Sequence, residues 1–443
     1  MAFALPVTLD SLLEGSSLHR SQRGCFSQFI QKYSAVFEQE IDDLKQNGVV
    51  INAEDPVEYF AILMHALHSG VTIWLASPHW KEHEWAQLKT EGDGLVDVYP
   101  LRLGGSTRGD SKCIITVFPL EERTDYIYVP TGGTTGKVRF VRHTVENFII
   151  GARALLNHLS VSKLNNLCCL PLFHVSGLMQ VFRALESGGQ IYFLNKWKSL
   201  SEIESVIVVS EKFAISLVPS QLNEMIEDDV QVSFLQKLDF VFIGGSHLSG
   251  KLANRARELN LPLAPCYGMS ETAAMVTLLK PSLFLEGNSS YGRVMEHAAI
   301  KIKDESCSET IISAKSMFLG YHSDPIRPNR SFHTGDSGFV DGSGDFNFYG
   351  RLDDRVDSGS EKFYLSDIEY VMDSMRGLIA YKLLVVDDAR WGQIVHAKVQ
   401  LATFFSEKDL LFQLKDSLAR HKIPKEIMVV DSLTLDRPMK KTL

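Results

Sequence analysis

The fold is decided by the stretch Tyr128-Val129-Pro130-Thr131-Gly132-Gly133-Thr134-Thr135-Gly136-Lys137-Val138-Arg139. It continues a short apolar run, Tyr126 to Val129, that predicts a buried strand. Its glycines allow backbone amides to approach phosphate oxygens, its threonines add hydroxyl donors, and its two cations add positive charge. We therefore interpret the stretch as a phosphate-binding loop that follows a strand, and not as a simple connecting turn.

The loop departs from the Walker pattern of kinases and many ATPases. That pattern requires a Gly at the position of Thr131 and a Ser or Thr directly after Lys137, where this sequence has Val138. A Walker-type nucleotide hydrolase is therefore disfavoured, although the loop still predicts a ligand that carries phosphate.

The composition is that of an ordinary globular protein. The chain has 443 residues, 45% of them hydrophobic and 22% charged. Because single cores usually stop growing near roughly 250 to 300 residues, we expect two or more domains. The net charge of -9 argues against a nucleic-acid partner. No run approaches the ~20 apolar residues of a membrane span, and the first residues lack the basic start of a signal peptide, so we expect a cytoplasmic protein without a membrane span.

The cysteines include no Cys-x-x-Cys pair. Neither a disulfide framework nor a structural zinc site is indicated. We interpret all of them as buried thiols: Cys25, Cys113, Cys168, Cys169, Cys266 and Cys307.

From about residue 20 to residue 300, helical patterns alternate with short apolar runs, which predicts an α/β fold with mostly parallel sheets flanked by helices. The expected strands include Val71 to Ala76, Cys168 to Leu170, Gln190 to Leu194, Ala214 to Val218 and Phe240 to Ile243, and the expected helices include Val145 to Leu159, Gln221 to Ile226 and Lys251 to Leu259.

The pattern of predicted elements changes in the last third of the sequence. Residues 290–350 predict a β-rich subdomain of short strands and tight turns, either a small β-barrel or an antiparallel unit. The polar segment Gly350 to Arg355 predicts an exposed linker. We therefore expect a large domain of residues 1–353 and a small α+β domain of residues 354–443.

Four more motifs follow the loop. Each has an ordinary structural explanation by itself, because a single His on an apolar stretch is usually a core residue and Ser before Glu suits the start of a helix. The motifs are Leu170-Pro171-Leu172-Phe173-His174-Val175-Ser176-Gly177-Leu178, Phe240-Val241-Phe242-Ile243-Gly244-Gly245-Ser246, Tyr267-Gly268-Met269-Ser270-Glu271-Thr272 and Phe332-His333-Thr334-Gly335-Asp336.

Taken together and in this order, the motifs resemble those of the adenylate-forming superfamily, which comprises acyl-CoA ligases, luciferases and peptide-synthetase adenylation domains. The resemblance covers most of the chain. It implies an acid–thiol ligase that uses ATP and Mg2+ to convert a small carboxylic acid to an acyl-AMP and then transfers the acyl group to coenzyme A.

The resemblance also implies which residues bind the nucleotide. The loop would hold the ATP phosphates, Tyr267 would pack on the adenine, the Ser270 hydroxyl would meet the α-phosphate, and Glu271 would hold magnesium through a carboxylate oxygen. Asp336 would bind the ribose hydroxyls. The full nucleotide set is Thr131, Gly132, Gly133, Thr134, Thr135, Gly136, Lys137, Gly244, Gly245, Ser246, Tyr267, Gly268, Ser270, Asp336 and Arg351.

The acid and coenzyme A are assigned in the same way. The residues implied for them are His174, Ser176, Gly268, Met269 and Gly359, with Asp354 as the hinge of a mobile C-terminal domain, and the catalytic residues implied are Lys440, His174 and Arg351. The tail departs from the superfamily pattern, because Thr434 stands in place of Pro and Met439 in place of Gly. Lys441 is therefore an alternative to Lys440 as the adenylation lysine. Phe140 likewise stands in place of a loop Gly.

The compact length and several local details resemble the superfamily branch that serves menaquinone and phylloquinone biosynthesis. The acid of that branch has an aromatic ring and two carboxylates, so its pocket needs a cation or amide donors for the carboxylate that does not react. The sequence does not identify that cation. Other aryl or fatty acids remain alternatives.

Two further classes stay open. A relative that binds nucleotide without catalysis would share most of the motifs. A metal hydrolase is suggested only by His79 and His83, which have the i, i+4 spacing of a helix, but a solvated helix face explains the pair better. The sequence leaves the oligomeric state open, and a homo-oligomer is possible.

Overall fold

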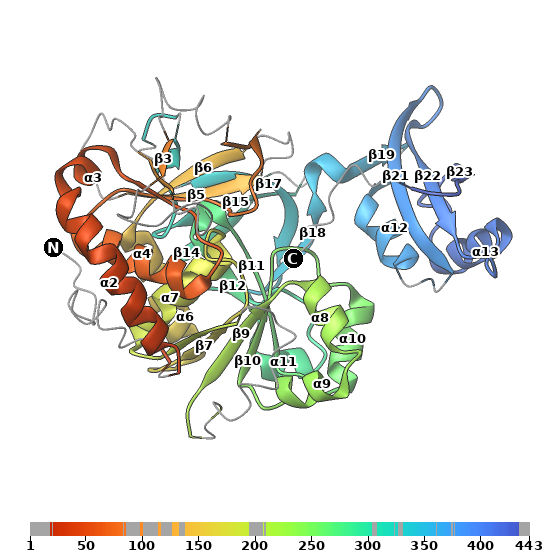
Figure 1. The fold of residues 1–443 in the computed structure, drawn as a ribbon. Helices are drawn as coiled ribbons and strands as arrows, with labels where there is room; N and C mark the ends of the chain where they lie inside the picture. Colours follow the sequence, from red (N-terminus) through yellow and green to blue (C-terminus); the bar gives the residue numbers. More distant parts are fainter. Residues whose placement is uncertain are drawn as a thin grey trace.

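Four sheets and their helices organise the chain in a computed structural model (Figure 1). The structure describes residues 18–19, 21–82, 84–85, 98–100, 114–116, 126–132, 138–194, 207, 210–303, 308–322, 324–326, 331–359, 361–373, 375 and 377–433. A short pair of strands, β3 (Val98–Pro100) and β4 (Ile114–Thr116), lies beside them.

The largest sheet has seven strands in the order β13-β12-β11-β10-β9-β7-β8. Five of them run parallel: β7 (Asn165–Cys168), β8 (Ile191–Phe193), β9 (Phe213–Leu217), β10 (Phe240–Ile243) and β11 (Leu263–Met269). The strands β12 (Ala274–Leu278) and β13 (Arg293–Val294) continue it antiparallel. Four helices lie in the same part of the chain as this sheet: α8 (Pro219–Met225), α9 (Asp229–Leu235), α10 (Gly250–Glu258) and α11 (Pro281–Leu285).

A five-stranded sheet carries the phosphate loop. Its order is β1 (Val49–Ile51), β2 (Ile73–Leu75), β5 (Tyr126–Gly132), β6 (Val138–Thr144) and β16 (Gly320–Tyr321). The helices α2 (Arg23–Gln39), α3 (Ile41–Asn47) and α4 (Pro56–Ser69) accompany it. The largest apolar core joins β1, β2 and α4 of this part to residues of α6 (Val145–Leu159) and α7 (Val175–Ser187), so these two helices link the two sheets.

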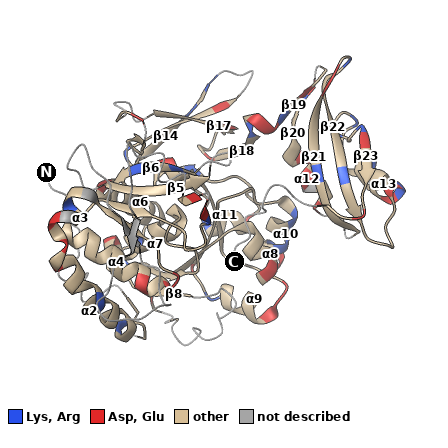
Figure 2. Ribbon diagram, turned by 45° about the horizontal axis from the view of Figure 1, so that its top comes forward, with Lys and Arg blue, Asp and Glu red and all other residues tan. Residues whose placement is uncertain are grey.

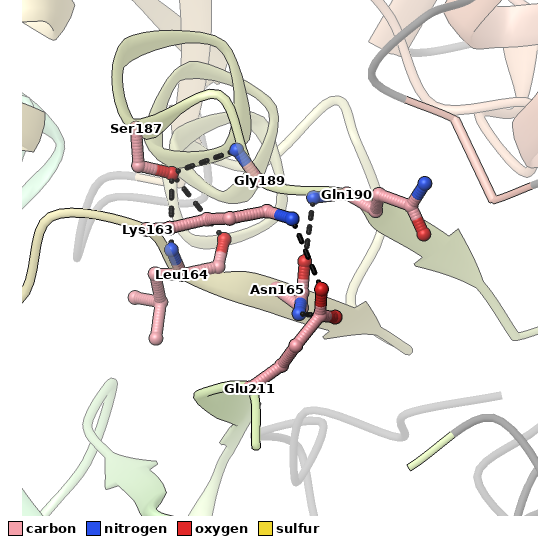
Figure 3. A network of polar contacts seen from close by, with 7 residues as sticks. All are labelled: Lys163, Leu164, Asn165, Ser187, Gly189, Gln190 and Glu211. Carbon is pink, nitrogen blue, oxygen red and sulfur yellow. Dashed lines mark hydrogen bonds and ion pairs between the residues drawn. The ribbon is translucent and has the colours of Figure 1, made fainter. Parts of the chain in front are cut away.

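The amino-terminal edge of the seven-stranded sheet is closed by a network of polar contacts (Figure 3). Glu211 accepts from Lys163 Nζ at 3.1 Å and from Asn165 Nδ2 at 2.8 Å. Asn165 Oδ1 in turn accepts from the backbone N–H of Gln190 at 2.9 Å. Because the side chains bond to one another and to the backbone, this edge stabilises the starts of β7, β8 and β9.

The last third of the chain forms two smaller sheets. An antiparallel sheet contains β14 (Ala298–Lys303), β15 (Glu309–Ala314), β17 (Ser331–Val340) and β18 (Phe346–Arg351). After the short helix η3 (Leu352–Asp354) comes a separate unit with its own apolar core, which stands to one side in both views (Figures 1 and 2). It comprises β19 (Arg355–Ser358), β20 (Glu361–Tyr364), α12 (Leu365–Met372), β21 (Leu378–Asp388), β22 (Gly392–Leu401), α13 (Glu407–Ser417) and β23 (Glu426–Val429).

The expected α/β class, with sheets flanked by helices and a small C-terminal α+β unit, is confirmed. Several expectations are wrong. Gly350 and Arg351 are not linker but the end of β18, because they pair with β17. Cys25 is exposed on α2, and Cys169 and Cys266 are only partly buried, so of the four cysteines that the structure describes only Cys168 is buried as expected. In the part of the chain that the structure covers, no helix is both long and apolar enough for a membrane span.

Candidate active site

The carboxyl ends of the parallel strands meet at one edge of the seven-stranded sheet, where open α/β sheets bind ligands. The strand β7 leads toward His174, β10 leads into Gly244, Gly245 and Ser246, and β11 leads into Ser270. The N–H of Gly244 donates to Leu217 O at the end of β9, at 3.3 Å. The motifs on these strands are therefore brought to the same edge by the topology of the sheet.

The most closely defined group is Tyr267, Asp336 and Arg351. Antiparallel pairing of β17 with β18 sets Asp336 directly opposite Arg351. Arg351 Nη1 donates to Asp336 Oδ1 at 2.7 Å, and the Tyr267 hydroxyl donates to Asp336 Oδ2 at 2.6 Å. The carboxylate is only 5% exposed. Tyr267 and Arg351 thus both donate to one buried carboxylate, although the three residues come from different parts of the sequence.

The electrostatics of this group keep both donors protonated. Burial and the adjacent Asp336 raise the pKa of Tyr267 well above its usual range. Burial lowers the pKa of Arg351, but the carboxylate of Asp336 outweighs it, so the net shift is upward. Burial raises the pKa of Asp336, and the hydrogen bonds from Tyr267 and Arg351 oppose that rise.

Two glycines of the motifs are required by close approach. A Cβ on Gly268 would lie 2.0 Å from Ala274 O, at a bulge in the pairing of β11 with β12. Gly335 has φ +69°, and its Cβ would lie 2.9 Å from Arg351 Nη2. Larger residues at these positions would displace the turn after Tyr267 or the guanidinium beside Asp336.

The Ser270–Glu271 segment forms a short 3-10 helix, η2 (Ser270–Thr272), that is fixed from two sides. His143 Nε2, on β6, lies 2.7 Å from Ser270 O. The Tyr321 hydroxyl, on β16, donates to Glu271 Oε1 at 2.7 Å. The five-stranded sheet therefore holds this segment at the edge of the seven-stranded one.

The donor set at Glu271 fits magnesium bound together with a nucleotide. Among the described residues, no group of three or more His, Cys, Asp or Glu side chains could hold a metal alone. Magnesium in nucleotide sites usually takes one or two carboxylates, with the remaining ligands from phosphates and water. A single half-buried carboxylate beside a phosphate loop agrees with that pattern.

The structure describes the two ends of the phosphate loop. Thr131 pairs with Arg139 and Gly132 with Val138 across β5 and β6. The Arg139 guanidinium lies over the Tyr321 ring, 3.3 Å from its centroid. The predicted residues Gly133, Thr134, Thr135, Gly136 and Lys137 lie outside the described residues, and so do Lys440 and Lys441.

The acyl side is built on α7. His174 is the N-cap residue and is exposed. Ser176, Gln180 and Arg183 occupy positions i, i+4 and i+7 of α7, so all three lie on one face of the helix. Met269, expected beside the acid, precedes η2.

Arg183 is a residue that the sequence analysis missed. Its side chain is 1% exposed, it donates from Nη1 to Ser216 Oγ at 3.3 Å, and its guanidinium lies 5.1 Å from the centre of the Phe242 ring. Its Nε is buried without a hydrogen-bond partner among the described residues. Burial lowers its pKa to about 10, which still leaves a cation at neutral pH. The only signal in the sequence was a cation inside an otherwise apolar helical pattern.

The remaining predicted residues lie at the junction with the C-terminal unit. Asp354 ends η3, between β18 and β19. Gly359 follows β19 with φ +66°, and its N–H donates to Trp391 O. The rings of Tyr349 and Tyr364 stack across this junction with centroids 6.3 Å apart. The structure does not bring Gly359 into contact with the Asp336 group.

The helical pairing of His79 with His83 is wrong. His79 lies in a turn that precedes residues 82–85, and its N–H donates to Ser77 Oγ. His83 lies outside the described residues. This part of the chain therefore gives the metal-hydrolase interpretation no support.

Part of the chain matches a known family of enzymes. Residues 119–322 match the family model for AMP-binding enzymes. The matched segment contains the phosphate loop, His174, the Gly-Gly turn and the Tyr267 segment. The resemblance to the adenylate-forming superfamily is confirmed.

Similar proteins carry a more specific name. A 2-succinylbenzoate–CoA ligase from Listeria monocytogenes serotype 4b is 27% identical over 391 residues, which are 84% of this chain and 82% of the relative. The solved o-succinylbenzoate coenzyme A synthetase of Bacillus subtilis, in complex with the acyl-adenylate intermediate OSB-AMP, is 21% identical with a TM-score of 0.73, and the match covers 97% of this chain and 90% of that one. The same synthetase with ATP and magnesium ion gives a TM-score of 0.72 at 21% identity, covering 97% and 92%. The chain has the fold of these synthetases.

Proposed function

We propose that the chain is an AMP-forming acid–thiol ligase that converts 2-succinylbenzoate, ATP and coenzyme A to 2-succinylbenzoyl-CoA, AMP and pyrophosphate. The observation that carries the choice of acid is the buried cation Arg183, on the helix that begins at His174. The names of the similar proteins support the same acid. This activity belongs to menaquinone and phylloquinone biosynthesis, and the expected cytoplasmic location stays a prediction.

Arg183 suits the carboxylate that does not react. A buried cation without an acidic partner is costly, and an anionic ligand that forms charge-assisted hydrogen bonds offsets that cost. Ser176 and Gln180 add polar groups to the same face of α7, and Phe242 adds an aromatic wall. An acid with an aromatic ring and two carboxylates matches this combination, whereas a fatty acid would leave Arg183 unpaired.

In the first half-reaction a carboxylate oxygen of the acid attacks the α-phosphorus of ATP, and pyrophosphate leaves. Asp336 holds the ribose: a carboxylate has about four acceptor positions, and Tyr267 and Arg351 use two. Arg139, the phosphate loop and Lys440 stabilise the charge that develops on the phosphates. When bound, magnesium screens the phosphate charge, and Glu271 supplies a carboxylate ligand to it.

In the second half-reaction the thiolate of coenzyme A attacks the acyl carbonyl, and AMP leaves. Rotation about Asp354 removes Lys440 from the site and brings the face that carries Gly359 toward the acyl-AMP. The large domain, residues 1–353, then retains the nucleotide while the small domain, residues 354–443, changes its contacts. One site thus performs both steps in turn.

The test is a panel of carboxylic acids assayed for ATP-dependent AMP release with and without coenzyme A. We expect 2-succinylbenzoate to be the best substrate, with AMP release that depends on coenzyme A. Good turnover of benzoates or fatty acids without turnover of 2-succinylbenzoate would overturn the choice of acid and leave the ligase class standing. Nucleotide binding without turnover of any acid would overturn both.

The same assay separates the half-reactions. We expect Lys440→Ala to abolish acid-dependent pyrophosphate exchange and to retain thioester formation from supplied acyl-AMP, with Lys441→Ala as the matched control. If Lys441→Ala alone loses exchange, Lys441 is the adenylation lysine.

A further inference from the structure

Tyr321 stands between two groups that the proposed function assigns to the nucleotide. Its hydroxyl donates to Glu271 Oε1 at 2.7 Å, and the Arg139 guanidinium lies over its ring, 3.3 Å from the centroid. One side chain therefore contacts both the carboxylate assigned to magnesium and a cation at the end of the phosphate loop.

Tyr321 is itself held firmly. It is 7% exposed, and its strand β16 pairs with β6 so that Tyr321 lies opposite Val141. The Phe318 ring packs edge-on against it with centroids 5.1 Å apart. The Phe318 N–H also donates to Glu271 O at 2.8 Å. The backbone and the side chain of Glu271 are thus fixed by the same short segment of chain.

The two contacts use different parts of the tyrosine. The hydroxyl makes a charge-assisted hydrogen bond, which fixes the orientation of the carboxylate. The ring face attracts the guanidinium through a cation–π interaction. Removal of the hydroxyl alone should therefore disturb the carboxylate and spare the cation, whereas removal of the ring should disturb both.

We infer that Tyr321 is a positioning residue that orients the Glu271 carboxylate toward the divalent cation and seats Arg139 at the phosphate loop. The inference rests on the proposed function, because that function assigns Glu271 to magnesium. Groups that orient a metal ligand typically contribute 10- to 100-fold to metal affinity.

The test measures binding of Mn2+, as a spectroscopic substitute for Mg2+, by electron paramagnetic resonance at a saturating concentration of a non-hydrolysable ATP analogue. We expect Tyr321→Phe to weaken Mn2+ binding about 10-fold and to leave binding of the analogue in EDTA unchanged. Tyr321→Leu should weaken both. In a Glu271→Gln background, Tyr321→Phe should cause no further loss of Mn2+ affinity.

The matched control is Tyr33→Phe, because Tyr33 also donates to a glutamate, Glu58 Oε1, at 2.7 Å, in the contact between α2 and α4. It should lower the melting temperature and leave Mn2+ affinity unchanged. The inference is overturned if Tyr321→Phe, folded by circular dichroism, binds Mn2+ like the wild type, or if it weakens Mn2+ binding equally in the Glu271→Gln background. If the wild type itself binds no Mn2+ with the analogue and releases no AMP, the proposed function fails as well.

Discussion

The two edges of the seven-stranded sheet differ in whether their charged side chains have partners within the chain. At the amino-terminal edge, Glu211 is bonded to Lys163 and Asn165 (Figure 3). At the carboxyl edge, Arg183 is almost fully buried, and within the described part of the chain its guanidinium donates only to the neutral Ser216 hydroxyl. A charge whose partners lie in the chain stabilises the fold, whereas a buried charge without an ionic partner among the described residues suits the anionic ligand proposed above.

The magnitudes support this distinction. The side chains of Lys163 and Glu211 are 47% and 35% exposed, so their ion pair contributes at most about 1 kcal/mol. An unpaired buried ion costs several kcal/mol. Arg183 cannot avoid that cost by losing its proton, because its pKa of about 10 leaves it charged at neutral pH. The Ser216 hydroxyl and the Phe242 ring offset part of that cost, and the proposed anionic ligand would offset the rest.

The largest expected effect is that of Asp336→Asn. Loss of the charge removes the partner of Arg351 and one acceptor for the ribose, so we expect acid-dependent pyrophosphate exchange to fall at least about 100-fold, or roughly 2.7 kcal/mol. Asp341→Asn, at the exposed turn between β17 and β18, should retain the wild-type rate. Similar rates for Asp336→Asn and the wild type would remove Asp336 from the site.

The next effect concerns the acid. Because the spectator carboxylate would lose its cation, Arg183→Leu should raise the KM for 2-succinylbenzoate about 100-fold and leave the KM for ATP unchanged. It should not lower the melting temperature of the free protein, because an apolar side chain replaces an uncompensated charge. The control is Arg153→Leu on α6, whose arginine pairs with Glu186 at 2.7 Å. Steady-state kinetics and melting curves check both points; a lower melting temperature with an unchanged KM would mean that Arg183 is structural.

His297 shows the alternative open to a buried group that can lose its charge. It is 6% exposed, its ring nitrogens have no hydrogen-bond partner in the described part of the chain, and burial lowers its pKa to about 4. Its folded pKa lies below its unfolded one, so the stability it contributes is present above about pH 6.5 and is lost as the pH falls toward 4. Between pH 7 and pH 5, His297→Leu should lose about 2 kcal/mol less unfolding free energy than the wild type. Urea denaturation at both pH values measures this; equal losses would contradict the pKa shift.

The smallest effect on activity is expected at the amino-terminal edge. Asn165→Ala leaves the Gln190 N–H without its acceptor, so the free energy of unfolding should fall by about 1 to 2 kcal/mol. The rate of AMP release should stay that of the wild type, as checked by denaturation and by the coenzyme A-dependent assay. A rate that fell with stability unchanged would mean that the two edges are not functionally separate.

Local signals in the sequence predicted some elements fully. The helix Val145 to Leu159 was predicted to the residue, because its apolar pattern starts after Thr144, whose N–H bonds to Asn147 Oδ1. The strand Phe240 to Ile243 was also predicted to the residue, because it is a short apolar run that ends at two glycines.

Long-range pairing was not visible in the sequence. Gly350 and Arg351 were predicted to be part of a linker, because their polar residue types do not indicate that β18 pairs with β17. Arg183 was missed because only tertiary packing shows that the polar position of a helical pattern is buried. The roles proposed for Tyr267, Asp336 and Arg351 came from ordered motifs, whereas the hydrogen bonds that join them needed coordinates.

The most direct test of the account is calorimetric titration of a sulfamate analogue of 2-succinylbenzoyl-AMP into the wild type, Asp336→Asn, Arg183→Leu and Asn165→Ala. If the carboxyl edge binds one acyl-adenylate across its length, the first two substitutions should each weaken binding at least about 10-fold, and Asn165→Ala should not change it. Wild-type affinity in Arg183→Leu, with tight binding still lost in Asp336→Asn, would contradict a dicarboxylate site at this edge.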